Sequence, residues 1–334
     1  MSHKKKISVR FIAEESGVST ATVSRVLNHD KNVSEATRKK VLRILEKYEY
    51  EAPAAPPSKV TKIGVLVPTG QSDYYMTLLR EIGFYYRQRN IHVIACNCEE
   101  QKDYIPSALE TLYDSNISGL ILIACDYQSI KEHLSAKIPH VWIDCNDAPT
   151  DSSNICQVQS DHYVAGKIAA QELIRKNCVR PIIMTNATLS HRSFDRINGF
   201  RSVFEENHIP FADSQIIYMP RIKNFFAESQ ETIRYMVTRG DQFDSIFAIN
   251  DIRSLGALVG LQQMNLKVPD DIKLIGFDGI SIACNSILNI TCIQQNIELL
   301  TINACDMLSK LMNQEAVLEK RILVPTTLLG GQTI

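Results

Sequence analysis

From residue 62 onward, short apolar runs alternate with longer amphipathic segments, and this alternation constrains the fold more than any other feature of the sequence. Runs such as Ile-Gly-Val-Leu-Val at 63–67 are short and continuously apolar, so each predicts a buried strand. We expect strands over 63–67, 93–95, 119–123, 140–143, 181–184, 216–218, 245–249 and 272–277, with helices between them that include 74–90 and 163–176. The alternation predicts an α/β fold with parallel sheets covered by helices on both faces.

These strands are too many for one ordinary sheet, and they fall into two series. The helix expected over 163–176 begins the second series. We therefore expect residues 61–334 to form a core of two similar lobes with a cleft between them. In such folds a ligand binds where the carboxyl ends of the strands face the cleft.

The first 50 residues differ from the rest in both pattern and charge. They hold 11 Lys and Arg against 6 Asp and Glu, whereas the remaining residues hold 25 against 31. Helical spacing predicts three short helices, over about 9–15, from Ser19 to 27, and after a cap at Ser34. A basic, all-helical head on an acidic body suits a domain that meets phosphate groups.

A proline-alanine segment over 51–60 separates the head from the core. Pro53, Pro56 and Pro57 cannot continue a helix, so we expect an extended linker there.

Several functional classes are not favoured by the sequence. The nine cysteines form no CxxC pair and the eight histidines are dispersed, so we expect reduced thiols, no metal site and no cofactor. No apolar run follows the charged N-terminus, and none approaches the ~20 residues that span a bilayer, so we expect a cytoplasmic protein with no membrane partner. Neither a phosphate-binding glycine loop nor a nucleophile elbow is present, so an enzyme is not expected.

The chain resembles the lactose repressor/galactose repressor (LacI/GalR) family. In the head the matching residues are 12–19, 22–28, 33–34, 37–38 and 48–50. In the core they are 63–68, Asp161 with 165–166, Arg196 with 199–200, 250–251 and 276–278. The resemblance implies a helix-turn-helix head at 1–50, a periplasmic-binding-protein-like core that dimerises, and chain crossings between the lobes near 159–161, 290–293 and 322–324.

In a helix-turn-helix the second helix enters the major groove of DNA and its first residues face the bases. The resemblance assigns base contacts to Thr20, Ala21 and Arg25, and an arginine there suits guanine. Short hydrogen-bonding residues suit the phosphates. The full set that we predict to contact DNA is Ser19, Thr20, Ala21, Thr22, Ser24, Arg25, Asn28 and Ser34.

For the core, the resemblance and the strand ends together indicate an effector site between the lobes. The guanidinium of Arg196 presents a planar fork that can bind two oxygens of a sugar or a carboxylate. Aspartate accepts from sugar hydroxyls, and an aromatic ring stacks on the apolar face of a sugar. The predicted effector-binding residues are Tyr75, Asp144, Arg196, Asn250, Asp278 and Gln295. The alternative for each polar residue is a cap or a turn.

Two departures from the family pattern stand out. Phe11 lies where the family usually has an aspartate, and the linker is short and lacks the leucine of the family's hinge helix. We therefore expect residues 51–60 to stay extended even on DNA.

The sequence thus predicts a homodimeric repressor that binds double-stranded operator DNA under the control of a small effector, most simply a carbohydrate. A corepressor such as a purine remains an alternative. A solute-binding protein would share the lobes but needs an export signal and no DNA-binding head.

Overall fold

The computed structural model describes residues 8–27, 33–48, 50, 60–68, 73–98, 104–147, 155–187, 190–219, 224–279 and 289–334. The chain divides into two compact units, Met1–Val60 and Thr61–Ile334. Most of the proline-rich linker and Asn28 lie outside the described residues, so the expectations for them are not addressed by the structure.

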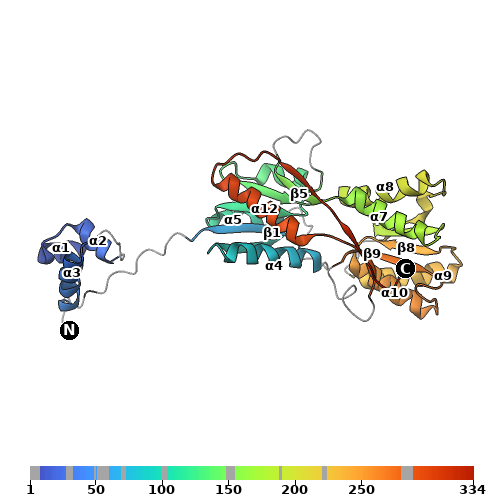
Figure 1. Cartoon of the computed structure of the whole chain (residues 1–334), viewed down its shortest axis with the longest axis horizontal. Coiled ribbons are helices and arrows are strands. Elements are labelled where there is room, and N and C mark those ends of the chain that lie inside the picture. The colour runs from blue at the N-terminus through green and yellow to red at the C-terminus, as the bar shows by residue number, and fades with distance from the viewer. Residues whose placement is uncertain are drawn as a thin grey trace. The chain divides into compact units, whose positions relative to one another are not determined.

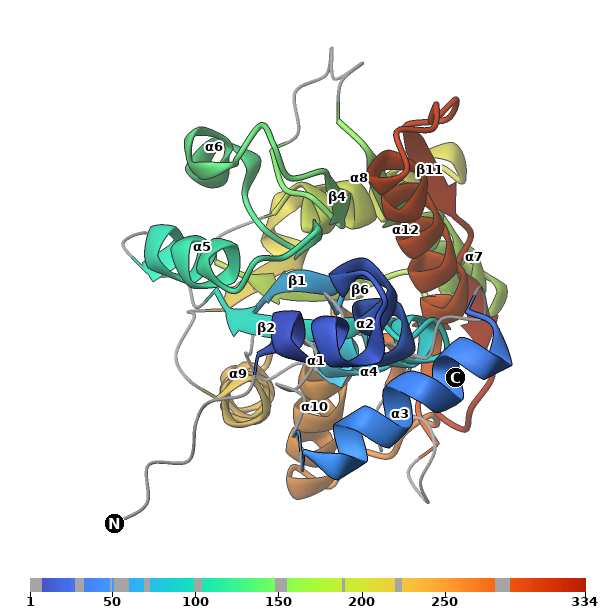
Figure 2. The same cartoon turned by 90° about the vertical axis from the view of Figure 1, so that its left-hand side faces the viewer.

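The first unit contains the helices α1 (Val9–Ser16), α2 (Thr20–Leu27) and α3 (Glu35–Lys47), which pack against one another (Figure 2). The hydroxyls of Ser8, Ser19 and Ser34 accept from backbone amides in the first turns of the three helices, as Ncap residues do. Gly17 ends α1 in the left-handed conformation, at φ 61°, which costs glycine little. The core of this unit consists of Ile12, Ala13, Val23, Val26, Val41 and Leu45.

Two apolar residues of the head, Phe11 and Leu42, differ in how they pack. Phe11 packs edge-on against Tyr48, with ring centroids 5.1 Å apart, and so joins α1 to the end of α3. Leu42, which shares the helical spacing of Val41 and Leu45, is instead 47% exposed. The adjacent position on a helix points about 100° away, so a neighbour of a buried residue need not be buried.

The second unit has two lobes, each built on a six-stranded sheet (Figure 1). The first sheet has the strand order β11-β5-β4-β3-β1-β2 and the second β12-β10-β9-β8-β6-β7. All strand pairs are parallel except β10 with β12. The elements associated with the first sheet are β1 (Lys62–Val67), α4 (Asp73–Arg87), β2 (His92–Asn97), α5 (Tyr104–Asp114), β3 (Gly119–Ile123), α6 (Tyr127–Ile130), η1 (Lys131–His133), β4 (His140–Ile143), β5 (Gln157–Ser160), α12 (Ile297–Met312) and β11 (Arg321–Val324).

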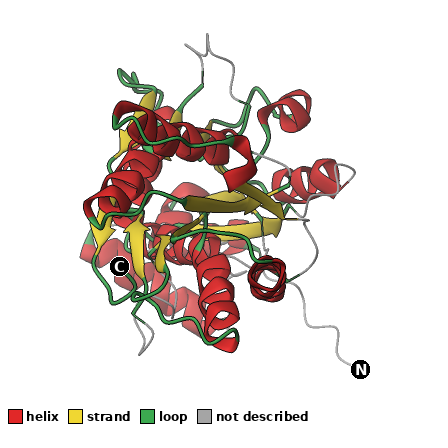
Figure 3. Ribbon diagram, turned by 90° about the vertical axis from the view of Figure 1, so that its right-hand side faces the viewer, coloured by secondary structure: helices red, strands yellow, loops and turns green. Residues whose placement is uncertain are grey.

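The second lobe repeats the arrangement. Its elements are α7 (His162–Arg175), β6 (Pro181–Asn186), α8 (His191–Glu206), η2 (Asp213–Gln215), β7 (Ile216–Met219), α9 (Phe225–Arg239), β8 (Ser245–Ala248), α10 (Asp251–Gln263), β9 (Lys273–Asp278), β10 (Thr291–Gln294) and β12 (Thr327–Leu329). In this lobe the strands lie between helices (Figure 3).

The central strands of each sheet, such as β1, β3, β8 and β9, are buried on both faces, as the continuous apolar runs predict. In the first lobe α4 and α12 supply Leu78, Ile82 and Leu308 to one core cluster, whereas α5 supplies Leu109 and Leu112 to another. In the second lobe one cluster joins α7 and α8 to the sheet, and the other joins α9 and α10.

The chain passes between the lobes three times, after β5, after β10 and after β11. The second and third passages come slightly later than expected. Residues 291–294 are paired with β9, so the passage follows at 295–296, not at 290–293. Residues 321–324 are paired with β5, so the last passage lies at 325–326.

Candidate functional site

The predicted DNA-contacting residues gather on the exposed side of α2. Thr20, Ala21, Ser24 and Arg25 are exposed, whereas Val23 and Val26 on the opposite side are buried in the core of the head. Thr20 and Ser24 are four residues apart, as are Ala21 and Arg25, so this set shares one face of the helix. The exposed side chains of α2 do not support the core and are therefore available to contact bases in a groove of DNA.

The two capping serines are exposed at helix N-termini. Ser19 Oγ accepts from the amide of Thr22 at 3.1 Å and lies 2.9 Å from the Thr22 hydroxyl. Thr22 is half-buried, and its hydroxyl already has a hydrogen-bond partner within the protein. Ser34 makes the equivalent contacts with Thr37, at 3.2 and 2.7 Å. Because helix N-termini carry partial positive charge, α2 and α3 begin where phosphates bind favourably.

The second candidate site lies between the lobes and centres on Asp144, which follows β4. Its side chain is fully buried. Oδ2 accepts from the hydroxyl of Tyr74 at 2.6 Å, and Oδ1 accepts from the amide of Ser160 at 3.3 Å. Oδ1 also lies 3.3 Å from Nε2 of His162, at the start of α7 in the other lobe. Asp144 therefore holds together the end of one sheet, a chain passage and the first helix of the second lobe.

The ionisation of this pair follows from its surroundings. Burial by itself raises the pKa of the Asp144 carboxyl, but its contacts with His162, Arg192 and Tyr74 outweigh burial and hold that pKa well below its usual range. Burial lowers the pKa of His162 to about 4, although the hydrogen bond with Asp144 opposes the shift. Near neutral pH the pair consists of a carboxylate and a neutral imidazole, with Nε2 donating the proton.

A hydrogen-bonded chain runs from this cluster to Asp278, at the end of β9. The hydroxyl of Ser160 donates to Oε1 of Gln295 at 2.6 Å, and Nε2 of Gln295 donates to Oδ1 of Asp278 at 2.7 Å. Burial and then the charge of Asp251 raise the pKa of Asp278 well above its usual value. Ser160, through its amide and its hydroxyl, and Gln295, through its side chain, thus connect a carboxyl group in each lobe.

Arg196 lies on α8 and is 7% exposed. One terminal nitrogen donates to the carbonyl of Ile249 at 2.6 Å, the guanidinium carbon lies 3.8 Å from the centroid of the Phe277 ring, and Nε is buried without a hydrogen-bond partner. Burial lowers the pKa of Arg196 to about 10, which the charge of Asp278 opposes and the charge of Arg192 assists. Contacts within the second lobe position Arg196, but its Nε has no hydrogen-bond partner.

Asn250 and Tyr75 have contacts of other kinds. Asn250 acts as the N-cap of α10, because its Oδ1 accepts from the amide of Arg253 at 2.8 Å, which matches the capping alternative. Tyr75 is half-buried, packs against the core of the first lobe and has its ring 5.4 Å from that of Tyr74. It also lies close to Arg192 of the cluster, whose pKa it helps to raise. It is the neighbouring Tyr74 that bonds to Asp144.

The structure adds four residues that the sequence analysis did not select: Tyr74, Ser160, His162 and Arg192. Arg192, at the start of α8, donates from Nε to Oδ1 of Asn146 at 3.3 Å, and one of its terminal nitrogens lies 3.8 Å from Asp144. Its spacing of four residues from Arg196 was a signal in the sequence, because residues so spaced share a helix face.

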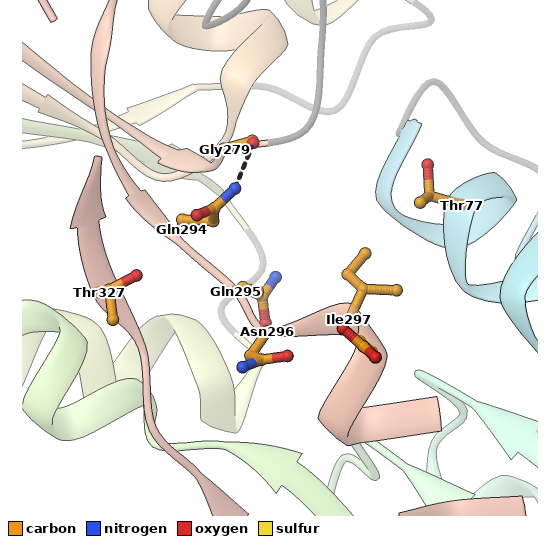
Figure 4. Close-up of a pocket in the computed structure, with 8 residues that line it drawn as sticks. Thr77, Gly279, Gln294, Gln295, Asn296, Ile297 and Thr327 are labelled. Carbon is orange, nitrogen blue, oxygen red and sulfur yellow. Dashed lines mark hydrogen bonds between the residues drawn. The ribbon is translucent and has the colours of Figure 1, made fainter. Parts of the chain in front are cut away.

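A pocket of about 410 Å³ opens beside the second passage (Figure 4). It is lined by Thr77 of α4, Gly279, residues 294–298 and Thr327 of β12. Of the predicted effector residues it includes Gln295 but not the cluster around Asp144 and Arg196. The candidate effector site is therefore the charged cluster, which contains Asp144, Arg196, Asp278 and Gln295.

The described part of the chain holds no group of side chains able to bind a metal ion and no helix long and apolar enough to cross a membrane. Cysteines from Cys96 to Cys305 that carry free thiols are mostly buried. Cys292 is disulfide-bonded, which corrects the expectation of a reduced thiol at that position.

Comparison with known proteins addresses both units. Residues 9–52 match the bacterial regulatory proteins of the lacI family, and residues 60–332 match the periplasmic binding proteins and sugar binding domain of the LacI family. Among curated proteins, the chain is 26% identical to the ribose operon repressor of Halalkalibacterium halodurans, over 98% of this chain and 96% of that protein. It is 26% identical to catabolite control protein A of Priestia megaterium, over 96% of each, and 24% identical to the HTH-type transcriptional repressor PurR of Histophilus somni, over 92% and 93%.

Solved structures agree on the fold. A Lac repressor bound to ONPG in the repressed state superposes with a TM-score of 0.78 at 21% identity, covering 99% of this chain and all of that one. A transcriptional regulator from Alkaliphilus metalliredigens, complexed with D-xylulofuranose, superposes with a TM-score of 0.69 at 22% identity over 82% of this chain and 98% of that one. With a helix-turn-helix head, a two-lobed core and family matches to both units, the chain belongs to the LacI family of bacterial regulatory proteins.

Proposed function

We propose that this protein is a cytoplasmic transcriptional repressor, not an enzyme, that binds operator DNA as a homodimer and loses or gains affinity for it when a small effector binds between the lobes. The observation that carries the proposal is that one chain joins a LacI-type head at 9–52 to an effector-binding type of core at 60–332. Two of the three curated relatives named above are called repressors, one of them of the ribose operon, and the third is named for catabolite control.

The exposed face of α2 supports DNA binding. Arg25 offers a fork of donors for guanine, Ala21 offers a methyl group for thymine, and Thr20 and Ser24 offer hydroxyls. The core of the head is complete without these side chains, so nothing in the fold of the head requires them.

The cluster between the lobes supports control by an effector. Asp144, Gln295, Asp278 and Arg196 lie at strand ends, on a passage and on α8, so a ligand among them contacts both lobes. A ligand shifts the lobes only if it binds one arrangement better than another, and the change reaches DNA only through that difference in affinity. A carbohydrate fits the mixed donors and acceptors. A purine corepressor is the second candidate, because the similarity to PurR spans most of the chain.

The test has two stages. The purified full chain is incubated with random genomic fragments of its source, and bound fragments are sequenced to find an operator. Sugars and nucleobases are then screened for a rise in the melting temperature, since a ligand of the folded state stabilises it. We expect a ligand that raises the melting temperature also to change operator affinity. Absence of any sequence-selective DNA binding contradicts the proposal.

A further inference from the structure

Helix α8 presents two arginines to the region between the lobes, one turn apart. Arg192 and Arg196 share a helix face because they are four residues apart. The side chain of Arg192 is 12% exposed and Arg196 is 7% exposed. Two like charges held this close with little water are unfavourable unless acceptors compensate them.

The nearby carboxyl groups are already engaged by other donors. Asp144 accepts from Tyr74, the Ser160 amide and His162. Asp278 accepts from Gln295, and its raised pKa reduces the negative charge that it offers to Arg196. The acceptors in the cluster are thus largely used within the protein.

The donors of the two guanidinium groups are used unequally: Nε of Arg192 donates to Oδ1 of Asn146 at 3.3 Å, and Tyr75 also interacts with Arg192 and raises its pKa. Nε of Arg196 is buried and lacks a partner, which is costly unless a ligand supplies an acceptor. The terminal nitrogen of Arg192 lies 3.8 Å from Asp144, which is an ion pair beyond hydrogen-bond length. The unmet donor of the cluster is therefore Nε of Arg196 on α8, beside a second guanidinium that is held by an ion pair longer than a hydrogen bond.

We propose that the effector of this protein is an anion, a small molecule whose carboxylate or phosphate oxygens bind the Arg192–Arg196 pair, with Arg192 selecting the acidic ligand over its neutral counterpart. This inference rests on the proposed function and narrows its effector class. Guanidinium groups bind carboxylate and phosphate through paired hydrogen bonds, and a buried pair of positive charges with one unmet donor favours such a ligand over a hydroxyl. The rest of the cluster, including Gln295, remains available to hydroxyl groups.

The experiment compares matched ligands on the full-length protein. The panel is glucose, gluconate and glucose 6-phosphate; ribose and ribose 5-phosphate; galactose and galacturonate; and inorganic phosphate alone. Calorimetry measures each affinity, and gel shift measures the effect on operator binding. We expect an acidic member to bind at least tenfold more tightly than its neutral counterpart. Comparing gluconate and galacturonate with the two sugar phosphates shows whether the site prefers a carboxylate or a phosphate.

Arg192→Gln removes the charge while keeping an amide donor, and we expect it to abolish the preference for the acidic ligand. Arg234→Gln is the matched control, because Arg234 is exposed on α9 and pairs with Glu231. Circular dichroism melting without ligand shows whether the Arg192 variant folds. Arg192→Lys provides a second test, since it keeps the charge and should retain part of the preference.

Equal affinity for acidic and neutral members overturns the inference, as does an acidic preference that survives Arg192→Gln. Failure of every acidic member and of phosphate to bind also overturns it. A neutral sugar that binds and changes operator affinity overturns the anionic effector but leaves the repressor function standing. Loss of the repressor function itself is recognised separately, by the absence of selective DNA binding.

Discussion

Oδ1 of Asp144 lies 3.3 Å from Nε2 of His162, and the two residues belong to different lobes. Both side chains are almost completely buried. Burial lowers the pKa of the imidazole to about 4 and thereby keeps it neutral, while the carboxylate stays ionised. A contact of this kind joins the lobes directly and depends on pH.

The pH dependence of stability should reveal this pair. The folded pKa of His162, about 4, lies below the ordinary histidine value of about 6.5, so between these values the unfolded chain binds more protons and stability falls as the pH falls. Over that window the contribution lost is about 3 kcal/mol. Because other groups also titrate there, the informative quantity is the difference from His162→Gln, whose glutamine can still donate to Asp144.

Urea unfolding of both proteins from pH 7 to pH 4 measures that difference. The stability advantage of the wild type over His162→Gln should shrink or reverse by about 3 kcal/mol. A difference that stays constant with pH would show that His162 does not titrate between the two states as described.

The contact between α7 and α8 predicts a second stability effect. A Cβ atom added at Gly199 would lie 2.0 Å from the carbonyl oxygen of Tyr163, and one at Gly166 would lie 2.0 Å from that of Arg196. Gly199→Ala should therefore destabilise the core by about 3 kcal/mol or more, because backbone cannot move aside cheaply. It should also displace Arg196, which lies on the same helix.

Gly83→Ala on α4 is the matched control, since a Cβ there meets nothing within 4 Å. It should stabilise the protein by about 0.5–1 kcal/mol through helix propensity. Denaturant titration compares the two variants. Similar small effects for both would mean that α7 and α8 do not approach each other as closely as described.

Arg25→Ala should weaken specific operator binding by about 1–3 kcal/mol while leaving nonspecific binding largely unchanged. The side chain is exposed on α2 and contributes nothing to the core of the head, so folding should be unaffected. Binding to operator and to scrambled DNA is measured at several salt concentrations. An equal loss on both DNAs would make Arg25 a phosphate contact instead of a base contact.

Arg196→Ala should abolish the response to effector but leave DNA binding intact. A stability loss of about 1–3 kcal/mol should accompany it, because the Ile249 carbonyl loses its donor and Phe277 loses the stacked guanidinium. Calorimetry with the identified effector and thermal melting separate the two effects. Unchanged effector affinity in a folded variant would remove Arg196 from the site.

The protein should be a homodimer on an imperfectly palindromic operator, because one helix-turn-helix reads a half-site. Light scattering at micromolar concentration should report twice the chain mass of 37.7 kDa. A monomer that still protects both halves of a palindrome from cleavage would contradict this expectation.

Much of the fold was predictable from local pattern. The strands at 119–123 and 140–143 coincide with β3 and β4, because a buried parallel strand is a continuous apolar run. The caps at Ser19 and Ser34 could be predicted because capping depends on neighbours in sequence. The short strands β5, β10, β11 and β12 were not assigned as strands, since their conformation depends on pairing with distant partners.

The site was predictable only in part. The sequence by itself determined the type of head, the two-lobed core and the candidates Asp144, Arg196, Asp278 and Gln295. Only the tertiary structure decided that Gln295 bonds to Asp278, and that His162 and Arg192 reach Asp144. The physical reason is that these contacts join residues far apart in the sequence, some of them across the lobes. Their geometry is set by three chain passages and by the close packing of α7 on α8, which no local pattern of residues encodes.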